Sequence, residues 1–163
     1  MSNLSRRNFF QSPLHQKNTI RPPWAVSEQQ FTELCTRCDE CISACPEKII
    51  VRGDGGFPEV KFIDSGCDLC EDCLNVCQTQ ALSRISDDTP AWLHKVKITK
   101  QCLPLQGVIC RTCHEACDEE AILFDLVAGQ VSVPQINFDN CNGCGFCIAM
   151  CPVDSIVIEP CDK

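Results

Sequence analysis

The chain has 163 residues and a net charge of −8, and its 44% hydrophobic content includes 17 cysteines. The acidic balance argues against nucleic-acid binding, which needs a basic face. No apolar run approaches the ~18 residues of a membrane-spanning helix, so membrane insertion is not expected. The length allows one or two small domains, and a core this poor in ordinary apolar residues needs metals or disulfides to hold it together.

Residues 1–30 contain no cysteine and are rich in basic residues, which predicts a flexible basic tail. The run Ser5-Arg6-Arg7 resembles the core of a twin-arginine export signal, but polar residues follow where such a signal needs an apolar segment. Export by this signal is therefore not expected. Consecutive prolines stiffen the segment that ends at Trp24, which is the expected anchor of the tail on the rest of the chain.

Four cysteine-rich runs follow the tail, and they are the main feature of the sequence. Residues 141–152 read C-x2-C-x2-C-x3-C-P, the spacing of a bacterial ferredoxin run that binds a [4Fe–4S] cluster. The same spacing recurs at 35–46 and, without the proline, at 67–77. The run 102–117 is a distorted copy with seven residues between its first two cysteines. The predicted cluster ligands are Cys35, Cys38, Cys41, Cys45, Cys67, Cys70, Cys73, Cys77, Cys102, Cys110, Cys113, Cys117, Cys141, Cys144, Cys147 and Cys151.

Other uses of these cysteines fit the pattern less well. Structural zinc sites join two C-x2-C pairs through a longer spacer, which leaves the C-x3-C element unexplained. A disulfide scaffold needs an oxidising compartment, and no complete secretion signal is present. His114 is expected to be a bystander beside Cys113, and Cys161 is expected to be a free thiol near the C-terminus.

The runs between the cysteines predict short hairpins, and the repeated order predicts a duplication. Strands are expected at 49–51 and around Val60 and Phe62 in the first copy, and at 122–124 and 131–136 in the second. A further strand at 156–158 is expected to be the counterpart of 49–51. The predicted fold class is α+β, a duplicated bacterial 2[4Fe–4S] ferredoxin-like fold of short hairpins and short helices around cluster loops. Its expected parts are a basic N-terminal tail at 1–30, a first ferredoxin-like unit at 31–83, a junction at 84–100 and a second unit at 101–163.

The number and pairing of the clusters follow from a rule of two-cluster ferredoxins, in which the fourth cysteine of each run ligates the other cluster. Similar intervals, from Cys45 to Cys67 and from Cys117 to Cys141, favour pairing of neighbouring runs. A nested arrangement, first run with fourth and second with third, stays open. Four clusters are expected, or three if the run that begins at Cys102 is vacant.

The tail and the motifs together resemble one family. The segment Arg21-Pro22-Pro23-Trp24-Ala25, the closely following Cys35-Thr36-Arg37-Cys38, the stretched third run and the Cys141–Gly145 loop resemble the NapF family of ferredoxin-type accessory proteins of bacterial periplasmic nitrate reductase systems. The missing prolines after Cys77 and Cys117 depart from the simple ferredoxin pattern.

The sequence has no phosphate-binding glycine loop, dinucleotide fingerprint or nucleophile–base pair, so no enzymatic activity is expected. The resemblance implies a cytoplasmic protein. Its implied partner is the precursor of the nitrate reductase catalytic subunit, which it would help to acquire a [4Fe–4S] cluster before export. The sixteen cysteines of the four runs carry over as ligands. The alternative is an electron-transfer ferredoxin of the nitrate reductase or quinol pathway. A third hypothesis is an interaction module whose clusters only hold the fold together.

Overall fold

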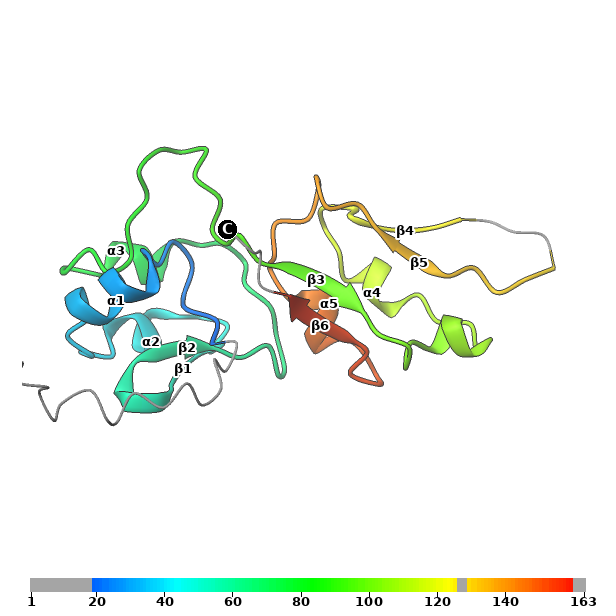
Figure 1. Cartoon of the computed structure of the whole chain (residues 1–163), viewed down its shortest axis with the longest axis horizontal. Coiled ribbons are helices and arrows are strands. Elements are labelled where there is room, and N and C mark those ends of the chain that lie inside the picture. The colour runs from blue at the N-terminus through cyan, green and yellow to red at the C-terminus, as the bar shows by residue number, and fades with distance from the viewer. Residues whose placement is uncertain (1–18, 126–128, 160–163) are drawn as a thin grey trace, which may run out of the picture.

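The computed structural model describes residues 19–125 and 129–159, which form two halves placed side by side (Figure 1). Short helices and two-stranded antiparallel sheets alternate with loops in both halves. The helices are α1 (Glu28–Leu34), α2 (Glu40–Ala44), α3 (Asp72–Asn75), α4 (Thr112–Glu115) and α5 (Phe146–Ala149), the 3-10 turns are η2 (Asp54–Gly56) and η3 (Leu103–Gln106), and the strands are β1 (Ile50–Arg52), β2 (Pro58–Val60), β3 (Lys95–Ile98), β4 (Ile122–Phe124), β5 (Pro134–Ile136) and β6 (Ile156–Glu159).

Each half contains the hairpin expected from the sequence. In the first half β1 pairs with β2, with Ile50 opposite Val60, and the glycine-rich segment between them forms η2. In the second half β4 pairs with β5, with Ile122 opposite Ile136. Each hairpin contributes buried side chains to the core of its own half, including Ile50 and Val60 in the first and Ile122 in the second.

The prediction that the last strand, at 156–158, is the counterpart of residues 49–51 was wrong. Strand β6 pairs with β3, which lies in the segment between the two cysteine-rich halves. The equivalent position in the first half is Leu82, which follows the second cysteine run and bridges to Ala25. The β-branched composition of residues 156–158 predicted a strand correctly, but composition alone does not select the partner of a strand.

The part of the N-terminal segment that the structure describes is packed and is not a free tail. Trp24 is 7% exposed, and Pro22 and Pro23 are fully buried. The backbone on either side of Ala25 bonds to the segment 81–83, so this stretch acts in the first half as β3 does in the second. The expected anchor at Trp24 is thus confirmed. The twin arginines and the rest of residues 1–18, like Cys161, lie outside the described residues.

The cores of the two halves adjoin each other. The first core is built around Phe31, which is 0% exposed, and the second is built around Ile122 and Val96. Ile148 and Ile158 pack against both cores. Within the described ranges, the chain has no helix long and apolar enough to cross a membrane.

Candidate metal centres

The sixteen cysteines of the four runs line four separate cavities, with four cysteines at each. Three of these cavities have closely similar volumes of about 340, 320 and 340 Å³, and the remaining one has about 860 Å³. We name them sites 1 to 4 after the run that supplies three of their cysteines. Site 1 is lined by Cys35, Cys38, Cys41 and Cys77, site 2 by Cys67, Cys70, Cys73 and Cys45, site 3 by Cys102, Cys110, Cys113 and Cys151, and site 4 by Cys141, Cys144, Cys147 and Cys117.

Every site takes three cysteines from one run and the fourth from the neighbouring run. Site 1 takes Cys77 from the second run, and site 3 takes Cys151 from the fourth. This is the neighbouring arrangement and not the nested one. It arises because the last cysteine of each run follows a helical turn that directs its sulfur away from its own loop and toward the adjacent site.

The loops of sites 1, 2 and 4 share an unusual backbone. The residues immediately before and after the second cysteine have positive φ, although most of them are not glycine, and such angles are uncommon for other residues. The residues with this conformation are Arg37 and Asp39, Leu69 and Glu71, and Gly143 and Gly145. Turns of this kind bring successive backbone N–H groups together, an arrangement that binds anionic groups in many iron–sulfur sites. At site 2 the N–H of Leu69 donates to Cys67 Sγ at 3.4 Å.

Backbone N–H groups also reach the fourth cysteine of three runs. The N–H of Leu82 donates to Cys77 Sγ at 3.4 Å, and the N–H of Ala121 donates to Cys117 Sγ at 3.3 Å. Cys151 Sγ accepts the N–H of Ser155 at 3.3 Å, and the Ser155 hydroxyl lies 3.2 Å from it. Hydrogen bonds of this kind stabilise thiolate ligands and tune the reduction potential of iron–sulfur clusters.

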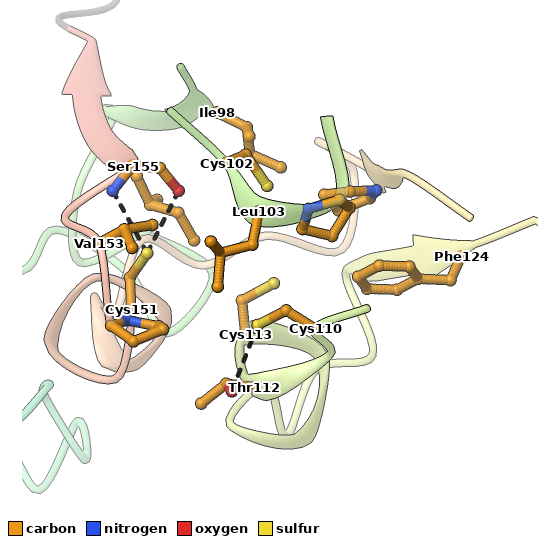
Figure 2. Close-up of a pocket in the computed structure, with 14 residues that line it drawn as sticks. Ile98, Cys102, Leu103, Cys110, Thr112, Cys113, Phe124, Cys151, Val153 and Ser155 are labelled. Atoms are coloured by element: carbon orange, nitrogen blue, oxygen red, sulfur yellow. Dashed lines mark hydrogen bonds between the residues drawn. The ribbon is translucent and has the colours of Figure 1, made fainter. Parts of the chain in front are cut away.

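Site 3 is closed despite the insertion in its run (Figure 2). The inserted residues fold as η3, which ends at Gly107 in a left-handed conformation and leaves Cys102 only 6% exposed. Figure 2 shows Cys102, Cys110, Cys113 and Cys151 around one cavity. Arg111 lacks the positive φ found at this place in the other loops, and the Thr112 hydroxyl lies 3.6 Å from Cys110 Sγ instead. The folded insert therefore places Cys102 beside the other three cysteines of the site, and it does not open the site to solvent.

Site 1 is the most open of the four. It has the largest cavity, and it is the only one of the four sites without a buried cysteine. Cys38 is exposed, and the other three cysteines of the site are half-buried. In contrast, site 2 contains the buried Cys73, site 3 the buried Cys102 and Cys113, and site 4 the buried Cys147.

The donor sets fit [4Fe–4S] clusters better than single metal ions. Among the described residues, no three His, Cys, Asp or Glu side chains converge as they would around one ion. A cubane cluster is larger than an ion, and it takes four cysteine thiolates, the set that each cavity provides. When bound, such clusters supply one-electron chemistry and exchangeable iron and sulfide.

Burial controls the protonation of the cluster-free thiols. It raises the pKa of Cys41 to about 11 and the pKa values of Cys67, Cys73 and Cys147 to about 12, from the ordinary value of 9.0. These thiols are neutral at pH 7, and they must lose protons when they bind iron.

Cluster loading should therefore become more favourable as pH rises from 6 toward 8.5. Protons compete with iron for the same sulfurs, and raised thiol pKa values strengthen that competition. Anaerobic reconstitution with iron and sulfide, followed by iron content and by proton release in weakly buffered solution, would measure it. Loading that is independent of pH with no proton release would contradict this prediction.

Two histidines and two large aromatic side chains near the sites have structural partners. His114 Nδ1 donates to the Ile122 carbonyl at 2.7 Å, a bond that accounts for this histidine without a metal. Phe62, Trp92 and His94 form a group between the halves, with ring centroids 5.2 to 6.4 Å apart. Sequence reasoning missed this group, because Phe62 is far in the chain from Trp92 and His94 and none of the three belongs to a motif.

Four cysteine cavities in two similar halves define a ferredoxin-type iron–sulfur protein with an internal duplication. Residues 34–81 and 108–155 each match the model of the 4Fe-4S dicluster domain family. The chain is 41% identical to the ferredoxin-type protein NapF of Haemophilus influenzae over 98% of this chain and 96% of the relative. It is 42% identical to NapF of Escherichia coli K12, over 87% of this chain and 85% of the relative. The ferredoxin-type protein NapG of the same strain is 32% identical, over 86% of this chain and 69% of the relative. The chain belongs to the NapF family of ferredoxin-type proteins.

Proposed function

We propose that this chain is a cytoplasmic iron–sulfur accessory protein, with no enzymatic reaction of its own, that supplies a [4Fe–4S] cluster to the catalytic subunit of periplasmic nitrate reductase before its export. In this proposal the sixteen cysteines at sites 1 to 4 hold four clusters. Similarity to NapF of Haemophilus influenzae over nearly the whole length supports the assignment to the nitrate reductase system.

The openness of site 1 is the observation that carries this function. A cluster that leaves its carrier must be reached by the thiolates of the acceptor, and site 1 offers that access through its larger cavity and its lack of a buried cysteine. Each exchange breaks one iron–sulfur bond to this chain and forms one to the acceptor, with no change of oxidation state. The pKa of the released Cys41 thiol is raised to about 11, chiefly by burial, so the freed thiolate takes up a proton at neutral pH. That protonation favours release.

A transfer assay with two matched variants tests the proposal. Cys38 and Cys70 occupy the same place in their runs and are both exposed, but they line sites 1 and 2 respectively. Protein loaded with iron-57 would be mixed anaerobically with catalytic subunit that has been stripped of its cluster, and the two would then be separated. The wild-type protein and Cys70→Ser should deliver label and restore nitrate-reducing activity, and Cys38→Ser should deliver neither.

Free iron and sulfide at the same concentration serve as the control for non-specific reconstitution. If label stays on the wild-type protein while intact reductase still accepts electrons from it, the maturation role is wrong. Equal transfer by both variants would mean that site 1 is not the donor.

Electron transfer to the nitrate reductase or quinol pathway is the second candidate. The observation that favours it is a backbone hydrogen bond from Cys67 at site 2 to Cys144 at site 4, because a relay needs adjacent clusters and a donor does not.

A further inference from the structure

The loops of sites 2 and 4 touch each other across the boundary between the halves. The backbone N–H of Cys67 donates to the carbonyl of Cys144 at 2.8 Å. Cys67 lines site 2 and Cys144 lines site 4. One hydrogen bond between two cysteine residues thus links a site of the first half directly to a site of the second.

Two glycines make this approach possible. A Cβ at Gly145 would lie 2.5 Å from the Phe62 ring, and a Cβ at Gly66 would lie 2.5 Å from the ring and the backbone nitrogen of Phe146. Neither position accepts a side chain without movement of the other half. Each glycine is the neighbour of a cysteine that takes part in the bond, so the close packing is located at the two cluster loops.

The segment 92–94 forms further hydrogen bonds to both halves near the contact between the loops of sites 2 and 4. The Trp92 ring N–H donates to the Arg21 carbonyl of the first half at 2.9 Å. His94 Nε2 donates to the Gly143 carbonyl in the site 4 loop at 3.0 Å. The Phe62 ring packs edge-on against Trp92 at a centroid distance of 6.0 Å.

Within each half the two sites are also adjacent. Site 1 takes Cys77 from the run of site 2, and site 2 takes Cys45 from the run of site 1. Sites 3 and 4 exchange Cys151 and Cys117 in the same way. The sites therefore follow one another in the order 1, 2, 4, 3 along the molecule.

We propose that the contact between the Cys67 and Cys144 loops joins the two halves into one four-site electron relay, with Phe62 and His94 as positioning residues. With clusters bound, one electron passes from the cluster at site 2, which is oxidised by one unit, to the cluster at site 4, which is reduced by one unit. The exchange is internal, so it needs no further oxidant or reductant. This inference rests on the ligand sets proposed above but not on cluster transfer to the reductase.

The test measures magnetic coupling in the full-length protein. The double variant Cys38→Ser/Cys110→Ser removes one ligand each from sites 1 and 3 and leaves sites 2 and 4 loaded, as iron and sulfide content would verify. After full reduction, the electron paramagnetic resonance spectrum should show spin–spin splitting between the two remaining clusters. Two magnetically isolated signals would overturn the proposal.

Positioning is tested by single variants in the four-cluster protein. Phe62→Ala and His94→Ala should each weaken the part of the coupling that crosses between halves, and should slow the exchange averaging of cysteine Cβ proton resonances in half-reduced samples. Phe57→Ala is the matched control, because Phe57 packs against Phe31 in the first half, with centroids 6.3 Å apart, and lies outside the contact. Unchanged coupling and exchange in fully loaded His94→Ala would overturn the positioning role even if Phe62→Ala loses iron.

The outcome is independent of the transfer assay. Protein that shows coupling across the halves but delivers no cluster contradicts the proposed function and leaves the relay standing. Protein that delivers its cluster but shows isolated signals contradicts the relay alone.

Discussion

Removal of the clusters should abolish cooperative folding of this chain. Two of the five buried residues in the second core, Cys113 and Cys147, are members of the cysteine sites. Strands in both halves are only three or four residues long, and the helices have seven residues or fewer. Small cores of this kind supply no more than about 3–5 kcal/mol without disulfides or metals, so loss of the clusters leaves too little to offset chain entropy.

Far-UV circular dichroism and calorimetry of chelator-stripped, reduced protein would measure this loss. The expected result is a broad, non-cooperative melt and a far-UV spectrum with little helix or strand. The stability of any residual fold should decrease further above pH 9, because buried thiols have raised pKa values in the folded chain. Burial raises the pKa of Cys67 to about 12 from 9.0, so between these values the unfolded chain releases a proton that the folded chain retains, which favours unfolding. A sharp, reversible transition like that of the loaded protein would contradict this prediction.

The sequence predicted the cysteine loops and both hairpins because their signals are local. Spacing fixes where a three-cysteine loop and its following turn lie, and a run such as Ile122-Leu123-Phe124 predicts a strand from side-chain shape. The positive φ of Leu69 was not predictable, since the loop imposes on leucine a conformation that leucine does not prefer.

Contacts between distant segments were the part that the sequence could not supply. The pairing of β3 with β6 and the packing of Trp24 each join residues that are tens of positions apart. Phe62 and His94 occur singly, with no spacing that relates them, and their role depends on how the two halves meet. Such roles appear only when the three-dimensional arrangement is known.

Paired substitutions should show that cysteines of neighbouring runs share a site. Cys77 belongs to the second run but lines site 1 together with Cys38 of the first run. Cys77→Ala and Cys38→Ala should each remove one cluster, and the double variant should also remove only one, because both changes destroy the same site. Cys77→Ala combined with Cys70→Ala should remove two, because Cys70 lines site 2.

Iron and sulfide per chain, measured after anaerobic reconstitution, distinguish the arrangements. Strong non-additivity is the mark of residues that act as one unit, and separate sites give additive losses. If the fourth cysteine instead stayed with its own run, Cys77→Ala with Cys70→Ala would cost one cluster and Cys77→Ala with Cys38→Ala would cost two. That reversed result would contradict the ligand sets, and with them the assignment of Cys38 and Cys77 to a single transferable cluster.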